Sequence, residues 1–265
     1  MPERTSYDPG VPCWVDLSTT DIDGAISFYG GLFGWDCQKA PQEEAGGYVM
    51  AYLRDKAVAG MVAQGPEQQS QGVPPNWTTY FATADADTTA KKAEAAGGTV
   101  FLPPFDVLDV GRMAVIADTA GAVFGIWQAK AHIGAGLVNE PGALSWNELI
   151  VEDPEAVIPF YRETFDHDVE VFGPEGPDAY RILKVSDNGI AGILKKPADM
   201  PAEVPPHWLT YFSVDGTDAT VAKIKELGGS ILAEPFDIPE VGRIAIALDP
   251  AFAAFGVITN AQPAS

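Results

Sequence analysis

The chain contains the same stretch of sequence twice. Residues 74–83 read PPNWTTYFAT and residues 205–214 read PPHWLTYFSV, with six of ten positions identical at a separation of 131 residues. A second pair, PPFDVLDVGRMAVIAD at 103–118 and EPFDIPEVGRIAIALD at 234–249, agrees at eight of sixteen positions with the same separation. Solenoid repeats recur every ~20–50 residues. A period this long in a chain of 265 residues therefore indicates a duplicated domain.

The two copies begin at similar segments and are joined by a linker. WVDLSTTDIDGAISFY at 14–29 aligns with WNELIVEDPEAVIPFY at 146–161. The intervening AKAHIGAGLVNEPGA is rich in Gly and Ala, which is typical of a connecting segment. We predict one domain over 8–128, a linker over 129–142 and a second domain over 143–261.

Each copy alternates between strand and helix periodicity. In the first copy, 11–18 has the alternation of a strand, and Asp21 is a suitable N-cap for a helix over 22–33. Two strands over 48–53 and 57–63 form a predicted hairpin, and a helix over 85–96 is ended by a Gly-Gly pair. Further strands are predicted over 77–83, 99–102, 112–118 and 122–128.

Composition and charge exclude several classes of partner. Lys and Arg number 16 against 37 Asp and Glu, a net charge of −21, and both halves of the chain are acidic. A phosphate backbone requires a basic surface, so we expect neither nucleic acid nor an anionic membrane as partner. No apolar run reaches the ~18 residues of a membrane span, and the N-terminus does not resemble a secretory signal. Cys13 and Cys37 are the only cysteines, which favours reduced thiols in a cytoplasmic protein.

A family resemblance is carried by the segment from Asp21 to Trp35. Its pattern D-x-D-x-A-x-x-F-Y followed by L-F-G-W, after a strand, resembles the glyoxalase / bleomycin-resistance / extradiol-dioxygenase superfamily, the vicinal oxygen chelate fold. The resemblance implies an α+β fold of two tandem glyoxalase-like domains. Four βαβββ modules would form cup-shaped, curved mixed sheets with the helices outside. Because the duplication already supplies both halves of a glyoxalase-like dimer, a monomer fits as well as a homodimer.

Enzymes of this family place a divalent metal in the cup, and the resemblance identifies the four ligand positions. In this chain they fall at Trp14 and Trp146, Gly60 and Gly192, Thr78 and Leu209, and Gly125 and Gly256. Indole has no lone pair for a metal and glycine has no side chain. We therefore predict no metal and no other cofactor. The conserved Trp/Gly/Gly set of both copies is interpreted as an aromatic-walled ligand cavity, with ordinary core packing as the alternative.

Candidate acid–base residues follow from strand alternation. Asp16 shares a face with Trp14, and Glu148 shares a face with Trp146, although both carboxylates could instead lie at strand ends in water. Tyr80 has the same parity as Asn76, and Tyr211 has the same parity as His207.

In glyoxalase dimers each site takes ligands from both partners, so the resemblance implies two mixed cups. One would combine Trp14, Asp16 and Gly60 with His207, Tyr211 and Gly256. The other would combine Trp146, Glu148 and Gly192 with Asn76, Tyr80 and Gly125. The first would hold an Asp/His/Tyr set suited to acid–base chemistry. The alternative is that His207 is an idle loop residue.

Three functions follow from these features. The first is a metal-independent binding protein that holds an apolar or aromatic small molecule, as bleomycin-resistance relatives sequester antibiotics. The alternative is a metal-independent enzyme of secondary metabolism, an isomerase, cyclase, lyase or hydroxylation partner, that uses Asp16, His207 and Tyr211. The third, a metal-dependent glyoxalase or dioxygenase, conflicts with the missing ligands.

Overall fold

Two eight-stranded curved sheets form the molecule, one from each copy of the repeat. A computed structural model describes residues 2–41, 46–176 and 178–261. The first sheet has the order β2-β3-β4-β1-β5-β8-β7-β6 and the second has the order β10-β11-β12-β9-β13-β16-β15-β14. The first sheet contains β1 (Pro12–Thr19), β2 (Asp36–Lys39), β3 (Val49–Leu53), β4 (Lys56–Ala63), β5 (Asn76–Ala82), β6 (Thr99–Val107), β7 (Gly111–Ala117) and β8 (Val123–Ala129). The second sheet contains β9 (Leu144–Val151), β10 (Asp168–Phe172), β11 (Tyr180–Val185), β12 (Asn188–Lys195), β13 (His207–Ser213), β14 (Ser230–Ile238), β15 (Gly242–Leu248) and β16 (Ala254–Asn260).

The helices are α1 (Ile22–Phe33), α2 (Pro66–Ser70), α3 (Ala86–Ala95), α4 (Pro154–Phe165) and α5 (Thr217–Glu226). Four of the helices follow the first strand of a βαβββ module, whereas α2 lies between β4 and β5. The Asp21 carboxylate accepts a hydrogen bond from the Gly24 N–H at 2.9 Å and so caps α1 as predicted. The predicted α+β fold of two tandem domains is confirmed, with strands that the sequence did not reveal at β2 and β10. No helix in the described ranges is long and apolar enough to cross a membrane.

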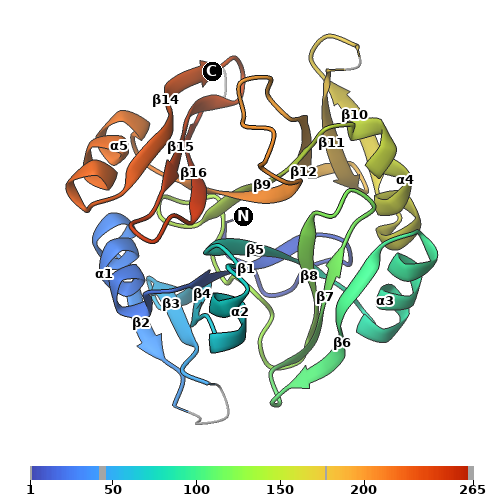
Figure 1. The fold of residues 1–265 in the computed structure, drawn as a ribbon, viewed down its shortest axis with the longest axis horizontal. Coiled ribbons are helices and arrows are strands. Elements are labelled where there is room, and N and C mark those ends of the chain that lie inside the picture. The colour runs from blue at the N-terminus through green and yellow to red at the C-terminus, as the bar shows by residue number, and fades with distance from the viewer. Residues whose placement is uncertain (1, 42–45, 177, 262–265) are drawn as a thin grey trace.

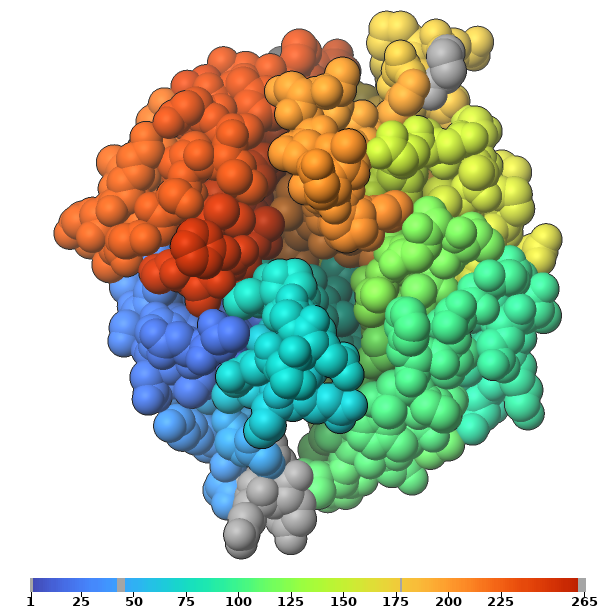
Figure 2. All heavy atoms as spheres, viewed as in Figure 1, coloured from blue at the N-terminus to red at the C-terminus, as the bar shows by residue number. Residues whose placement is uncertain are grey.

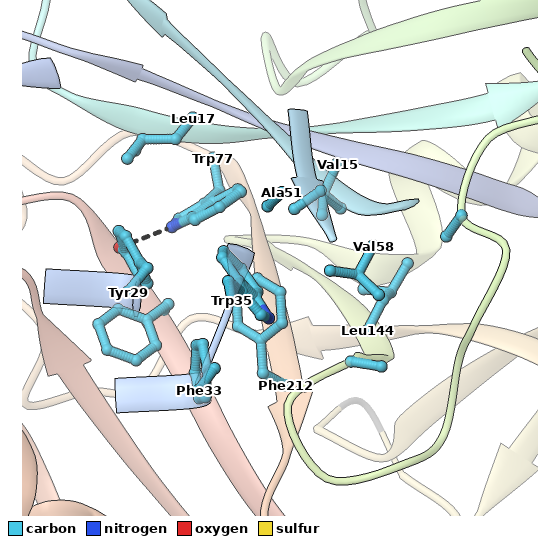
Figure 3. Close-up of a cluster of buried hydrophobic side chains, with 14 of the residues drawn as sticks. Val15, Leu17, Tyr29, Phe33, Trp35, Ala51, Val58, Trp77, Leu144 and Phe212 are labelled. Carbon is cyan, nitrogen blue, oxygen red and sulfur yellow. Dashed lines mark hydrogen bonds between the residues drawn. The ribbon is translucent and has the colours of Figure 1, made fainter. Parts of the chain in front are cut away.

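The two domains share their hydrophobic cores. Figure 1 shows α1 beside α5 and α3 beside α4, each pair joining one domain to the other. One core combines Tyr29, Trp35 and Trp77 of the first domain with Phe212 and Phe255 of the second. Figure 3 shows Phe212 among the aromatic side chains of the first domain, with the Trp77 indole donating to the Tyr29 hydroxyl at 3.0 Å.

The second core is also shared between the domains. It packs Phe81 and Phe124 of the first domain against Tyr161 and Trp208 of the second. Figure 2 shows the result as two closely joined halves, blue to green for the first domain and yellow to red for the second. Since residues alternate along a strand, the opposite face of each sheet is left free to form a cup.

Candidate functional site

Cup 1 is the face of the first sheet that carries Trp14, Asp16 and Tyr80. The Asp16 Oδ2 accepts a hydrogen bond from the Tyr80 hydroxyl at 3.0 Å and a longer one from the Tyr48 hydroxyl at 3.4 Å. The Trp14 indole N–H donates to the Tyr48 hydroxyl at 3.0 Å. Register places these groups together, because Trp14 pairs with Tyr80 and Asp16 pairs with Gly60 across neighbouring strands.

Cup 2, the face of the second sheet that carries Trp146, Glu148 and Tyr211, repeats this cluster with a longer acid. The Glu148 carboxylate accepts hydrogen bonds from the hydroxyls of Tyr180 and Tyr211, each at 2.8 Å. The Trp146 indole N–H donates to the Tyr180 hydroxyl at 2.9 Å. Each cup thus has one carboxyl group held by two phenols, one of which is held by an indole.

The glycines of the cups make room for these phenols. A Cβ at Gly60 would lie 1.7 Å from the Tyr48 Oη, and a Cβ at Gly192 would lie 1.7 Å from the Tyr180 Oη. Gly125 and Gly256 lie under the rings of Tyr80 and Tyr211. A Cβ at Gly125 would lie 2.1 Å from the Tyr80 ring, and a Cβ at Gly256 would lie 2.2 Å from the Tyr211 ring. The prediction that the glycines leave free volume for a ligand is therefore wrong at these positions, because tyrosine rings occupy it.

Burial changes the acid–base behaviour of both clusters. Desolvation raises the pKa of Asp16 to about 6, against the opposing effect of hydrogen bonds from Tyr80 and Tyr48. Desolvation also raises the pKa of Glu148, and the bonds from Tyr211 and Tyr180 oppose it. The pKa values of the tyrosines lie well above the usual value because of burial and the nearby carboxylate. The phenols are thus fixed hydrogen-bond donors, while the carboxyl group is the titrating member.

The residues of the cups do not fit a divalent metal. Each cluster offers one carboxylate, two protonated phenols and an indole that donates its proton. Within the described residues, no group of three or more His, Cys, Asp and Glu side chains is placed to hold a metal ion. First-row and alkaline-earth ions need several anionic or neutral lone-pair ligands, which these clusters do not provide.

The predicted combination of residues from both domains in one cup is wrong. Strand β5 pairs with β1, and β13 pairs with β9, so each sheet is continuous within one domain. Asp16 therefore contacts Tyr80 of its own domain, and Tyr211 contacts Glu148. The Asp16/His207/Tyr211 set is not assembled, because the two domains meet through the faces opposite the cups.

His207 and Asn76 lie at the beginnings of their strands, away from the clusters. The His207 Nδ1 lies 2.8 Å from the Pro205 carbonyl oxygen, and desolvation lowers the pKa of this histidine. Asn76 is exposed and its amide lies 3.3 Å from the Thr78 hydroxyl. The difference between Asn76 in the first copy and His207 in the second therefore does not distinguish the chemistry of the two cups.

Sequence reasoning missed Tyr48 and Tyr180. They are separated by 132 residues, the same offset that relates Trp14 to Trp146 and Asp16 to Glu148. That shared offset was the available signal. It was obscured because the flanking residues differ, GGYVM in one copy and DAYRI in the other.

A large cavity lies in cup 2. It has a volume of about 1150 Å³ and reaches Trp146, Glu148, Tyr180 and Tyr211. Most of its wall is apolar, and its aliphatic residues include Ile182, Ile190, Ile238, Val241, Ile244 and Ile258. Arg4 and Tyr7 of the N-terminal segment also line it, as does Pro12 of β1, so the first domain contributes to the cavity of the second. An apolar cavity with a few convergent polar groups is the usual form of a small-molecule site.

Comparison with known proteins agrees with this architecture. The family model for the Glyoxalase/Bleomycin resistance protein/Dioxygenase superfamily matches residues 13–126 and 143–253. The chain is 45% identical over 98% of its length to "Putative glyoxylase CFP32" of Mycobacterium tuberculosis, of which it covers 99%. It is 38% identical over 98% of its length to the anthracycline biosynthesis protein DauV of a Streptomyces species, of which it also covers 98%.

Solved structures share the fold at low sequence identity. The Mn(II)-bound glyoxalase of Novosphingobium aromaticivorans matches 99% of this chain and 84% of its own, with a TM-score of 0.66 and 13% identity. The 2,3-dioxygenase LapB of a Pseudomonas species matches 96% of this chain and 95% of its own, with a TM-score of 0.65 and 16% identity. The chain therefore belongs to the glyoxalase/bleomycin resistance protein/dioxygenase superfamily, as a tandem two-domain member.

Proposed function

We propose that this protein binds an apolar or aromatic small molecule in the cavity of cup 2 without a metal ion. The observation that carries the proposal is the cavity itself, about 1150 Å³ of mainly apolar space around a Glu148–Tyr180–Tyr211 cluster. Burial of a ligand's apolar surface contributes roughly 25 cal/mol per Å² before the costs of association. The polar cluster fixes the ligand's orientation at one end.

The cluster favours a ligand that carries a hydroxyl or another hydrogen-bond donor. Both tyrosine hydroxyls already donate to Glu148, so the lone pairs of the carboxylate and of Tyr211 are what remain for a ligand. A buried donor that meets these acceptors gains a hydrogen bond, whereas an unpaired buried acceptor costs about 1–3 kcal/mol. Hydroxylated aromatic compounds satisfy both the wall and the cluster. The relatives named for anthracycline biosynthesis support a role near such compounds.

A second function, metal-independent acid–base catalysis, is favoured by the raised pKa of Glu148. A raised pKa makes a carboxylate a stronger base, so the Glu148 carboxylate can accept a proton from a bound compound and later return it. The catalytic candidates are then Glu148 and Tyr211 in cup 2, in place of Asp16 and His207. Conversion of the bound compound distinguishes this function from simple binding.

The proposed function is tested by native mass spectrometry of the protein purified without chelators, followed by titration with two probes. The probes are 1,4-dihydroxyanthraquinone, which is flat, and 1-adamantanol, which is saturated and compact. We expect saturable binding of at least one probe, no stoichiometric metal and no product by liquid chromatography. Failure of both probes to bind would reject the binding function, and a stoichiometric metal would reject its metal independence. A product would favour catalysis.

A matched set of variants places the binding in cup 2. Tyr211→Phe and Tyr180→Phe each remove one hydroxyl from the cluster and should weaken binding about 2- to 10-fold. Tyr52→Phe is the control, because the Tyr52 hydroxyl has no hydrogen bond to any residue in the described ranges. Equal effects of all three changes would contradict the assignment.

A further inference from the structure

Cup 1 contains a planar ring supplied by the chain itself. The imidazole of His132, from the linker, lies edge-on to the Trp14 indole with ring centroids 4.5 Å apart and an interplanar angle of 88°. The centroid of the imidazole also lies 5.7 Å from the centroid of the Trp127 indole. No residue in the described ranges forms a hydrogen bond with its buried Nε2.

The linker is fixed in this position by backbone hydrogen bonds. The Ala135 N–H donates to the Cys13 carbonyl at 2.8 Å, and the Gly136 N–H donates to the Ala57 carbonyl at 2.7 Å. The His132 N–H donates to the Val110 carbonyl at 3.0 Å, while the Trp127 indole donates to the His132 carbonyl at 2.8 Å. The backbone of His132 and of the residues after it is thus held by the first domain.

The matching place in cup 2 belongs to the cavity. Trp146 corresponds to Trp14, and Ile258 corresponds to Trp127, since each lies two residues beyond the glycine that pairs with Tyr80 or Tyr211. Both Trp146 and Ile258 line the cavity. Trp146 is half-buried there, whereas Trp14 in cup 1 is only 3% exposed.

We infer that His132 is an internal occupant of cup 1, and that cup 2 binds one flat aromatic molecule at the equivalent position against Trp146. The inference rests on the proposed function and deepens it, because it specifies one ligand per chain and a planar ligand. Edge-to-face contact between aromatic rings favours a flat ligand beyond the gain from area alone. Ile258 is smaller than Trp127. It therefore leaves open in cup 2 the space that the Trp127 indole fills in cup 1.

The test counts adducts of 1,4-dihydroxyanthraquinone by native mass spectrometry, with affinities from a calorimetric titration. The wild-type protein should bind one molecule. Ile258→Trp should weaken its binding at least ten-fold, because the added indole fills the cavity as Trp127 fills cup 1. The control Phe252→Trp adds an indole at a side chain that is 71% exposed, and should bind as the wild type does. Trp127→Ile combined with His132→Gly should bind two molecules.

Several outcomes would overturn the inference. Two adducts on the wild-type protein, or one adduct whose affinity survives Ile258→Trp, would show that cup 1 is open or that the ligand lies elsewhere. Binding of 1-adamantanol without binding of the anthraquinone would reject the planar ligand and leave the proposed function standing. Thermal melts of each variant establish that it is folded, and Trp146→Leu provides a second change, expected to weaken binding about ten-fold.

Discussion

Each cup depends on the pairing of a glycine with a tyrosine. Gly60 lies under Tyr48, and Gly192 lies under Tyr180, so the ring can reach across the sheet to the carboxyl group. The glycine therefore matters for the close approach of a side chain rather than for its own backbone angles. Without it, the tyrosine hydroxyl could not occupy its place beside the indole and the acid.

Adding a methyl group at this contact should be costly. Gly192→Ala places a Cβ 1.7 Å from the Tyr180 Oη, and displacement of the ring should destabilise the fold by about 1–3 kcal/mol. Urea unfolding measures the loss. Gly216→Ala is the control, because its Cβ would meet nothing within 4 Å, and a loss below about 1 kcal/mol is expected there. Equal losses for the two variants would contradict the seating of Tyr180 on Gly192.

The raised pKa of Asp16 predicts a pH dependence of stability. An acid whose pKa is about 6 in the folded state and 3.8 in the unfolded state binds more protons when folded. Its contribution to the free energy of unfolding therefore falls as pH rises from about 4 to about 6, by up to about 3 kcal/mol. Urea unfolding at pH 4.5 and pH 7 should show this fall in the wild type and a smaller change in Asp16→Asn. An identical pH dependence in both proteins would show that Asp16 titrates normally.

At the scale of elements, the linker behaves as part of the first domain. Its Gly134 has a φ of +105°, and a Cβ there would lie 2.3 Å from the Cys13 carbonyl oxygen. The N-terminal segment pairs with the same linker, since the Arg4 N–H donates to the Gly136 carbonyl at 3.0 Å and the Tyr7 hydroxyl donates to the Ala135 carbonyl at 2.7 Å. The linker thus joins cup 1 to the segment that lines cup 2.

A change at Gly134 should release this segment. We expect Gly134→Ala to increase hydrogen exchange at the amides of Ala135 and Gly136 at least ten-fold, because their bonds to β1 and β4 would be strained. Gly136→Ala is a matched control, since its Cβ would make only ordinary contact at 3.5 Å from Lys56. Unchanged protection in Gly134→Ala would show that the linker adapts to the methyl group.

At the scale of the whole molecule, the domains complete one another. The Tyr29 hydroxyl of the first domain donates to Asp249 of the second at 3.1 Å, and the Tyr161 hydroxyl of the second donates to Asp118 of the first at 2.7 Å. Burial raises the pKa of both aspartates. The two larger hydrophobic cores also draw residues from both domains, so neither sheet buries its packing face alone.

Separation of the domains should therefore prevent folding. Residues 1–142 and 143–265, expressed separately, should show no cooperative thermal transition, whereas the full chain should unfold in one transition. Tyr161→Phe in the full chain should cost about 1–3 kcal/mol, because it leaves Asp118 buried without that donor. Tyr52→Phe again serves as its control. A cooperative transition in either separate half would contradict the shared cores.

The sequence by itself determined the duplication and the strand faces that carry Trp14, Asp16, Tyr80 and their counterparts, and its resemblance to a known superfamily implied the α+β fold. The duplication and the strand faces depend on local periodicity and on a repeat that is visible residue by residue. Only the tertiary structure decided which strands share a cup, that tyrosines occupy the space above the glycines, and that His132 lies in one cup while a cavity occupies the other. These outcomes depend on strand pairing and on contacts between residues far apart in the chain. One domain contains the same cluster as the other, so the sequence pattern could not distinguish pairing within a domain from pairing between domains.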